Sequence, residues 1–250
     1  MTALADHTNA LDAAAACAVV ELRRYTLHPG RRDTLIELFE REFVESQEAC
    51  GMRLLGQFRE LDDADRFVWL RGFADMESRA QALATFYGGP VWRTHREAAN
   101  ATMVDSDDVL LLRPARPDSG FALGAAGRAA VGAVPPPCGL VVAMIWQLPL
   151  RVGADFVELF ERRVLPPLRD AGATLLASFV SEHAANTFPA LPVREGENVF
   201  VCFAGFDDEA HWQRHFGDFP SATTPCPGGA ALADPQILRL APTARSRLRG

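Results

Sequence analysis

The chain has 250 residues, of which 48% are hydrophobic and 23% charged, so it is long enough for one large or two small globular domains. Its formal net charge of -7 argues against a nucleic-acid-binding protein, which needs a basic face to displace counterions from phosphates. All 25 basic residues are arginine, which excludes a Schiff-base lysine, a Walker A lysine and a kinase-type strand lysine.

The N-terminal segment of residues 1–17 is expected to be a disordered tail. Its small residues end in a cysteine in the manner of a secretion signal, but no arginine precedes Arg23, and Asp6 and Asp12 interrupt any apolar stretch. The chain also has no run of about 18 apolar residues that could span a membrane. Neither a targeting signal nor a membrane span is predicted.

The cysteines give a further indication of compartment. Five cysteines are widely spaced and form no CxxC pair, so the sequence predicts neither a zinc site nor a redox motif. This pattern favours a reduced, cytoplasmic compartment. The use of arginine in place of lysine favours a GC-rich bacterial source.

Polar side chains share one face of the first and third strands of the first half. Because side chains alternate between the two faces of a strand, Glu21, Arg23 and Tyr25 are expected to lie together, as are Trp69 and Arg71. Tyr25 and Arg71 are candidate catalytic residues, and the other three are candidate ligand-binding residues. Such a cluster suits an anionic or carbonyl-bearing ligand. A structural polar network at a barrel rim or between the halves is the alternative.

Helical segments separate these strands. The pentapeptide ELFER at residues 37–41 lies where apolar residues recur at spacings of three and four, which predicts an amphipathic helix. Gly51 is expected to end this helix, and a second helix starts near Asp75. A third helical run opens at Pro90.

The helical run from Pro90 carries two further candidate site residues. Trp92 and His95 are three residues apart and therefore share a helix face. His95 is a candidate acid or base near neutral pH, and Trp92 is a candidate ligand-binding residue. Packing with a polar tip is the alternative for this pair.

Residues 115–138 are expected to form a linker. They are rich in Pro, Gly and Ala and show neither a helical nor a strand period, although a short Ala-rich helix fits within them. The next β-type segment begins at Leu140.

The second half of the chain repeats the first. ELFER recurs at residues 158–162, an offset of 121 residues, and Gly172 follows at the same offset from Gly51. Strands farther along repeat at an offset of 133 residues, so the second half carries 12 extra residues between its middle strands. Pro166 and Pro167 are expected to kink or end the second ELFER helix.

The extra residues lie in the loop from His183 to Asn198. Two prolines stiffen this loop, and Phe188 is an apolar side chain that a solvated loop does not favour. We expect a lid or a docking arm folded on the barrel, with Arg194 held by a nearby acid. Phe188 and Arg194 are candidate ligand-binding residues.

A histidine pair lies near the start of the last predicted helix. His211 and His215 are four residues apart, a spacing that places both imidazoles on one face and can chelate a metal. His183 is the one plausible third histidine, and no HExxH motif accompanies the pair. A solvated or interface pair is favoured, and no metal is predicted.

Each half therefore has the order β-α-β-β-α-β, the ferredoxin-like arrangement of the α+β class. We expect domains at residues 18–114 and 139–243. A four-stranded sheet with helices on one face leaves its other face uncovered, and two such sheets can cover each other. The sequence predicts an intramolecular dimeric α/β barrel.

The first half resembles the NIPSNAP family in the segments ELRRYTLHPG (residues 21–30), FVWLRGF (67–73), PVW (90–92) and VLLLRP (109–114). The second half resembles it in NTFPALPVREGE (186–197). The resemblance implies the dimeric α/β-barrel, ferredoxin-like fold, and it implies no particular activity because NIPSNAP-like proteins lack an agreed catalytic motif.

The second half departs from the family pattern at its first strand. There Ala143, Ile145 and Trp146 stand near the positions that hold the polar residues of the first half. A site built from those polar residues therefore belongs to one half of the chain.

Two classes of function follow from these observations. The first is a NIPSNAP-like protein that binds a small apolar or anionic molecule, or a protein partner. The second is a cofactor-independent enzyme of the monooxygenase, isomerase or dehydratase type, since dimeric α/β barrels as a class include such enzymes. The sequence has no P-loop, no GxGxxG after a strand and no GxSxG elbow, so no organic cofactor is expected. A homo-oligomer is left open.

Overall fold

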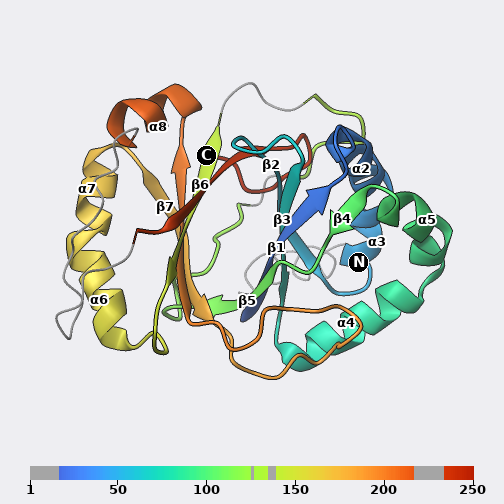
Figure 1. The fold of residues 1–250 in the computed structure, drawn as a ribbon, viewed down its shortest axis with the longest axis horizontal. Coiled ribbons are helices and arrows are strands. Elements are labelled where there is room, and N and C mark those ends of the chain that lie inside the picture. Colours follow the sequence, from blue (N-terminus) through green and yellow to red (C-terminus); the bar gives the residue numbers. More distant parts are fainter. Residues whose placement is uncertain (1–16, 125–126, 135–138, 217–233) are drawn as a thin grey trace, which may run out of the picture.

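Eight strands close into one antiparallel barrel, and the helices lie outside it (Figure 1). The computed structural model describes residues 17–124, 127–134, 139–216 and 234–250. The tail expected at the N-terminus falls almost wholly outside these ranges. Among the described residues, none of the helices has the length and apolar character needed to cross a bilayer.

The elements follow the predicted order in each half. The first half comprises β1 (Val19–Leu27), α2 (Arg32–Leu38), the π-helical turn η1 (Phe39–Phe43), α3 (Val44–Glu48), β2 (Arg53–Glu60), β3 (Arg66–Phe73), α4 (Met76–Gly88), α5 (Pro90–Asn100), β4 (Met103–Asp105) and β5 (Val109–Pro114). The second half comprises β6 (Leu140–Gln147), α6 (Ala154–Arg163), α7 (Leu165–Asp170), β7 (Thr174–Ser181), β8 (Val199–Phe206), α8 (Glu209–Phe216) and β9 (Gln236–Pro242).

Edge-to-edge pairing of the two halves closes the barrel. The hydrogen-bonded order is β3-β2-β9-β6-β8-β7-β5-β1, and β1 also pairs with β3. Within each half the order is ferredoxin-like, and the halves meet where β2 pairs with β9 and where β5 pairs with β7. The short β4 pairs with the end of β1. The predicted α+β fold of two ferredoxin-like halves in one barrel is confirmed.

The two faces of the barrel wall pack against different partners. Val20, Leu22 and Leu70 point inward and join an apolar cluster that fills the interior. Their neighbours along the strands, Tyr25 and Trp69 among them, point outward and pack under the helices of the first half. Because neighbours along a strand point to opposite faces, Glu21, Arg23 and Arg71 also point outward. The candidate site therefore lies between sheet and helices.

The two ELFER helices differ in detail. In the first half the helix widens into the π-helical turn Phe39–Phe43, and π-helical turns occur frequently at functional sites. In the second half the helix stops at Arg163 and resumes at Leu165, with Pro166 and Pro167 in the first turn of the new segment. The predicted interruption by these prolines is confirmed, since a proline inside a helix removes a backbone donor.

The segment expected to be a linker also covers the barrel interior. Phe121 packs against Phe179 and Phe203, with ring centroids 5.1 and 5.0 Å apart. Backbone hydrogen bonds fix this segment, since Ser178 N donates to Ser119 O at 2.8 Å. No helix forms in the described part of residues 115–138. The connection between the halves is thus part of the packed structure.

The role of Phe121 in packing leads to a stability prediction. Phe121→Ala should lower the free energy of unfolding by about 2 to 3 kcal/mol, below the range for a fully buried phenylalanine because the side chain is only partly buried. Urea denaturation followed by circular dichroism measures the change. Val131→Ala, at a side chain 52% exposed in the same connection, is the control and should change little. Equal, small effects of both substitutions would show that the connection is only a tether.

Candidate functional site

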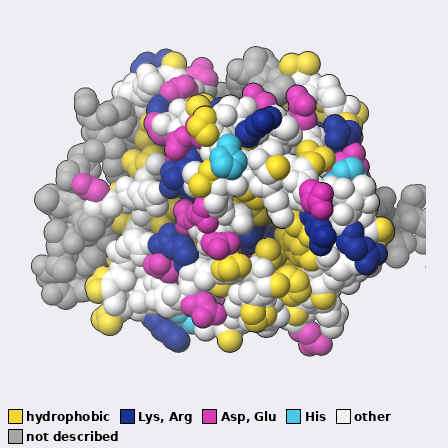
Figure 2. Space-filling model, turned by 45° about the vertical axis from the view of Figure 1, so that its right-hand side comes forward, with side chains coloured by type: hydrophobic (Ala, Val, Ile, Leu, Met, Phe, Trp, Pro, Cys, Tyr) yellow, Lys and Arg dark blue, Asp and Glu magenta, His cyan; other side chains and the backbone are white. Residues whose placement is uncertain are grey.

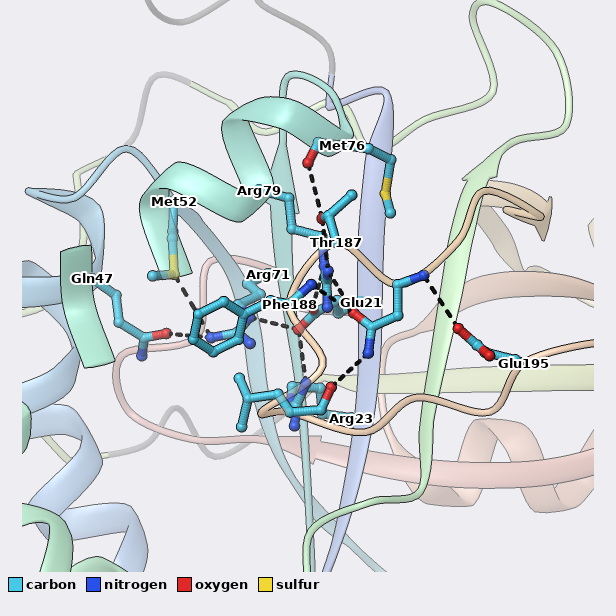
Figure 3. A network of polar contacts seen from close by, with 12 residues as sticks. Glu21, Arg23, Gln47, Met52, Arg71, Met76, Arg79, Thr187, Phe188 and Glu195 are labelled. Carbon is cyan, nitrogen blue, oxygen red and sulfur yellow. Dashed lines mark hydrogen bonds and ion pairs between the residues drawn. The ribbon is translucent and has the colours of Figure 1, made fainter. Parts of the chain in front are cut away.

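Four buried charged side chains gather on the outer face of the first half's sheet, and we call them the Glu21 cluster (Figure 3). Glu21 and Arg23 lie on β1, Arg71 on β3 and Arg79 on α4, and all four side chains are 0% exposed. The ladder between β1 and β3 places Glu21 directly opposite Arg71. Two strands and one helix thus contribute to the cluster.

One carboxylate holds the three guanidinium groups. Oε2 of Glu21 accepts hydrogen bonds from Nη1 of Arg23 at 2.9 Å and from Nε of Arg71 at 2.6 Å. Oε1 of Glu21 accepts from Nε of Arg79 at 2.7 Å. Charge-assisted hydrogen bonds of this kind are about twice as strong as neutral ones. Glu21 therefore fixes the relative positions of three cationic groups.

Neutral acceptors take some of the remaining guanidinium donors. Nε of Arg23 donates to the Tyr25 hydroxyl at 3.1 Å, and Nη1 of Arg71 donates to Oε1 of Gln47 at 3.1 Å. Two donors remain, since Nη2 of Arg71 and Nη2 of Arg79 are buried and have no hydrogen-bond partner in the described part of the chain. Buried donors without a partner are rare, and an acceptor placed beside them would be favourable.

The electrostatics of the cluster are unbalanced. Burial alone would raise the pKa of Glu21, but the neighbouring guanidinium groups, Arg71 foremost, outweigh burial and hold this pKa well below its usual range. Burial also lowers the pKa of Arg79, and the attraction of Glu21 offsets this only in part. Three cations face one carboxylate, and within the described residues no other carboxylate pairs with them. The cluster carries an excess of positive charge.

A small cavity, here called the aromatic cavity, adjoins the cluster between the sheet and the helices. Its volume is about 30 Å³. It is lined by Tyr25, Leu35, Phe39, Phe43, Gln47, Trp69, Phe86, Tyr87, Trp92 and Met103. The guanidinium carbon of Arg71 lies 5.0 Å from the centroid of the Trp69 ring, a cation-π distance. Aromatic faces and cationic groups therefore meet at this cavity.

Tyr25 connects the cluster to the aromatic cavity. Burial raises the pKa of its hydroxyl, although Arg23 acts in the opposite direction. The phenol is consequently neutral near pH 7. It can donate a hydrogen bond or a proton to a bound molecule, and it is not prepared to act as a base.

A larger, open cavity of about 580 Å³ lies at the other end of the cluster. Val19 and Met76 border this cavity. Val19 precedes Glu21 by two residues on β1, and Met76 precedes Arg79 by three residues on α4, so each pair shares one side of its element. The cluster therefore lies between an open cavity and an enclosed one. The face of the molecule shown in Figure 2 has a hollow with hydrophobic side chains beside it and basic side chains at its base.

The loop of residues 183–198, here called the strap, crosses from the second half onto the first (Figures 1 and 3). Nη1 of Arg79 donates to Oδ1 of Asn186 at 3.0 Å and to Oγ1 of Thr187 at 3.2 Å. The Thr187 hydroxyl donates in turn to the backbone oxygen of Met76 at 3.1 Å. The second half thus supplies neutral partners to a guanidinium of the first half.

The rest of the strap is held by a ring contact and by ion pairs. Phe188 stacks on Tyr87, with ring centroids 5.9 Å apart and an interplanar angle of 27°. Arg194 pairs with Asp108 at 3.1 Å and with Glu197 at 2.8 Å. The expected acid beside Arg194 is present. These contacts hold the strap in place and give Arg194 no part in the Glu21 cluster.

The structure separates the two candidates on α5. Trp92 lines the aromatic cavity. His95 is 27% exposed, and its Nε2 lies 3.5 Å from Oε2 of Glu42. Its ring centroid is 6.3 Å from that of Phe43, behind the cavity wall. His95 is therefore beside the site and contacts no member of the cluster in the contacts observed.

The register of the second half corrects one expectation. Val19 pairs with Phe73 on β3, and Leu140 pairs with Phe206 on β8, which aligns β1 with β6 at an offset of 121 residues. Glu21, Arg23 and Tyr25 therefore correspond to Val142, Met144 and Trp146. Ala143 and Ile145, expected at the first two positions, face the barrel interior instead. A shift of one residue moves a side chain to the other face of a strand.

The other members of the site also have apolar counterparts. Offsets of 133 residues for β3 and α4, and of 121 residues for the ELFER helix, align Arg71 with Ala204, Arg79 with Trp212 and Gln47 with Leu168. The N-terminal turns agree, since Asp75 accepts from Ser78 N and Asp208 from His211 N. All these counterparts lie in the buried apolar cluster of the second half. The same fold is therefore built without the charges.

Several residues of the site were not predicted from the sequence, among them Arg79, Gln47 and Asn186. Arg79 lies on the buried stripe of α4 with Leu83 and Phe86, and Gln47 continues a row of buried phenylalanines at helical spacing. A polar residue within an apolar stripe is a signal that was available. Asn186 gave no such signal, because its partner is known only once the strap is placed.

The histidine pair gives no metal site in the described residues. Nε2 of His211 lies 2.9 Å from the backbone oxygen of Ala171. The side chain of His215 lies outside the described part. Within the residues that the structure describes, no three His, Cys, Asp or Glu side chains are grouped so as to hold a metal ion.

Comparison with known proteins identifies the first half. The family model described as NIPSNAP matches residues 20–117. An uncharacterized NIPSNAP-like domain protein from Burkholderia xenovorans is 28% identical over 40% of this chain and 87% of its own, with a TM-score of 0.37. None of the curated proteins compared matches the chain. The resemblance seen in the sequence is confirmed for the first half.

Two solved structures match nearly the whole chain. A provisionally assigned monooxygenase from Fusobacterium nucleatum is 8% identical, covers 94% of this chain and 96% of its own, and has a TM-score of 0.56. Another from Lactobacillus acidophilus is 10% identical, covers 90% and 93%, and has a TM-score of 0.51. At such identities the likeness shows the fold alone.

The Glu21 cluster leads to a prediction on stability and pH. Glu21→Gln should lower the free energy of unfolding at pH 7 by about 3 to 5 kcal/mol, because three buried cations lose their carboxylate. The folded pKa of Glu21 lies below the unfolded one, so its stabilisation is present above about pH 4.3 and is lost as the pH falls. Below that pH, the difference between wild type and variant should shrink by about 1.4 kcal/mol per pH unit.

Urea denaturation between about pH 2.5 and pH 8 measures this difference. Glu158→Gln removes an exposed carboxylate, 51% exposed and paired with Arg162, and is the control that should cost less than about 0.5 kcal/mol. A Glu21→Gln effect that stays constant below about pH 4 would contradict the depressed pKa.

Proposed function

With residues 20–117 identified as a NIPSNAP domain, we propose that this half of the protein binds one small organic molecule in the aromatic cavity beside the Glu21 cluster. The single observation that carries the proposal is the difference between the halves. One half buries four charged side chains at a position where the other half buries apolar ones. Function is the simplest reason for keeping charges that the fold does not require.

Burying the four charged side chains costs free energy that apolar side chains at the same positions avoid. Removing each charged group from water costs several kcal/mol, which a buried ion pair recovers only with good geometry and further hydrogen bonds. The second half shows that Val142, Ala204 and Trp212 fill the equivalent space without that cost. Two donors of the cluster also have no partner among the residues that the structure describes. These features match a binding site that is complete only when occupied.

The cavity walls explain how a molecule could enter. At about 30 Å³ the cavity has room for about two water molecules, so a ligand must displace part of the wall. Tyr87 and Trp92 are only partly buried, and Phe188 of the strap covers Tyr87. Movement of these rings opens the cavity toward solvent. A flat molecule with an apolar body fits such walls best, because aromatic pairs favour stacked and edge-on contacts.

A protein partner has less support. The exposed large hydrophobic side chains of the described residues, namely Leu61, Val104, Val131, Val134 and Leu150, are spread over several separate segments. Scattered apolar side chains of this kind are ordinary on a protein surface.

A cofactor-independent enzyme is the second candidate function, and Tyr25 is the observation that favours it. Its neutral hydroxyl lies at the wall of the aromatic cavity and accepts a hydrogen bond from Arg23. A phenol beside a guanidinium group can deliver a proton to a carbonyl or enolate oxygen of a substrate. Tyr25 and Arg71 keep the candidate catalytic roles. His95, outside the cavity wall, is the weaker candidate.

Ligand binding can be tested with 2-naphthol as a flat, neutral probe. We expect one molecule to bind per chain in isothermal titration calorimetry, because the charged residues beside the cavity have apolar counterparts in the second half. Trp92→Ala removes part of the wall and should raise the Kd about tenfold, equivalent to about 1.4 kcal/mol of lost ring contact.

Phe156→Ala is the matched control, because Phe156 is a partly buried aromatic residue on the outer face of the second half. It should leave the Kd of 2-naphthol unchanged. Absence of binding, or equal weakening by both substitutions, would place the binding site elsewhere.

The enzyme candidate has its own test. Tyr25→Phe should leave the thermal unfolding midpoint within a few degrees and the Kd of 2-naphthol within about twofold, since only a hydroxyl is lost. With a substrate identified from molecules that co-purify with the protein, turnover should fall by about 10² to 10⁴. Unchanged turnover would remove Tyr25 from catalysis, and a variant that does not fold would assign the hydroxyl to structure.

A further inference from the structure

We propose that Arg71 and Arg79 form a subsite for a carboxylate group, so that the molecule bound by the first half is a small carboxylic acid with an apolar body. This inference rests on the proposed function, since it names the chemical class of the ligand. It is carried by the donors and the charge of the Glu21 cluster.

Two hydrogen-bond donors of the Glu21 cluster lack acceptors among the described residues. Nη2 of Arg71 and Nη2 of Arg79 are buried and have no hydrogen-bond partner in the described part of the protein. Each group carries two N–H bonds, and a buried donor left without a partner costs about 1 to 3 kcal/mol. Both guanidinium groups are attached to the same carboxylate, Arg71 through Oε2 of Glu21 and Arg79 through Oε1. The two guanidinium groups are therefore held by one carboxylate.

The site has more positive than negative charge. Arg23, Arg71 and Arg79 are fully buried and share one acid, so the cluster holds two positive charges that no described side chain balances. A buried charge without a partner is strongly destabilising, and one added anion halves the excess of positive charge. Neutral oxygens of Gln47 and Asn186 relieve the donors but not the charge.

The guanidinium groups of Arg71 and Arg79 are held in place before any ligand binds. Nε and Nη1 of Arg71 are occupied by Glu21 and Gln47, which leaves only Nη2 free. Nε and Nη1 of Arg79 are occupied by Glu21 and the strap in the same way. A planar carboxylate has two acceptor oxygens for such fixed donors. Preorganised groups of this kind lose little entropy on binding.

The two arginines lie between the aromatic cavity and the open cavity. The aromatic cavity includes Gln47, the partner of Arg71, and the open cavity is bordered by Met76, one helical turn before Arg79. An anionic group at the two arginines thus lies between an aromatic space for an apolar body and an opening to solvent. A molecule with a ring at one end and a carboxylate at the other matches this order.

The test compares benzoate with benzyl alcohol, which share a ring and differ in charge. Isothermal titration calorimetry at pH 7 should show benzoate binding to the wild-type protein at least about tenfold more tightly than benzyl alcohol. In Arg79→Gln, which keeps a hydrogen-bonding group without the charge, this preference should disappear. Arg59→Gln, at an arginine 27% exposed and paired with Asp33, is the control and should keep the preference.

A second variant guards against a folding defect in Arg79→Gln. Asn186 lies on the strap, and its Oδ1 is 3.0 Å from Nη1 of Arg79. Asn186→Asp therefore adds a competing carboxylate and leaves every arginine in place. The benzoate preference should fall by about tenfold in this variant. Thermal denaturation of each variant shows whether it is folded.

The outcomes separate the two proposals. If 2-naphthol binds but benzoate is no tighter than benzyl alcohol, the carboxylate subsite is wrong and the cavity proposal stands. If the preference survives in both Arg79→Gln and Asn186→Asp, the anion binds elsewhere and the subsite is again wrong. If none of the three probes binds, both proposals fail. Loss of preference in the two variants with retention in Arg59→Gln supports the subsite.

Discussion

The interaction on which the first half depends is the contact of one buried carboxylate with three guanidinium groups. Glu21 joins β1 to β3 through Arg71 and to α4 through Arg79, so a single side chain ties the sheet to the helical layer. Apolar packing alone performs this task in the second half, where Val142 and Trp212 occupy the corresponding places. The comparison within one chain separates what the fold needs from what the site needs. Because both halves share topology, the charges are additional to the fold.

Joining the two halves in one chain allows this difference. A barrel made from two identical chains presents the same site twice, because symmetry imposes the same residues on both copies. In a tandem chain the halves can diverge while the junctions β2–β9 and β5–β7 continue to close the barrel. Here one half carries the buried charges, and the other buries apolar residues at the same places and contributes the strap. The asymmetry is visible in the strand pairs, where Glu21 faces Arg71 and Val142 faces Ala204.

Much of the fold was predictable because the sequence contains an internal repeat. Two copies of ELFER at a constant offset identified the halves, their strand order and the inserted loop. The cluster on β1 and β3 followed from strand alternation, which requires no knowledge of distant contacts. Register was harder, and the shift from Ala143 to Val142 shows that an apolar strand reads alike in either register.

Other parts of the site depend on tertiary contacts. Arg79 lies 58 residues from its partner Glu21, and Asn186 lies 107 residues from Arg79. Such pairs become visible only when the chain is folded, although the position of Arg79 in an apolar stripe was a local signal. The composition around Phe121 predicts a linker, because its packing partners, Phe179 and Phe203, come later in the chain. The composition of residues 115–138 predicts a linker but does not predict that this segment packs against the barrel.

The strap has a consequence for how the protein is made. The ribosome completes the first half before the strap and β9 exist, yet β2 needs β9 as its edge partner and Arg79 needs Asn186 and Thr187. During synthesis the N-terminal half therefore exposes an open sheet edge and a guanidinium group without its neutral partners. Contacts this distant in sequence form late and slowly. Arg79 of the Glu21 cluster therefore gains its strap partners only after residues 186 and 187 have been synthesised.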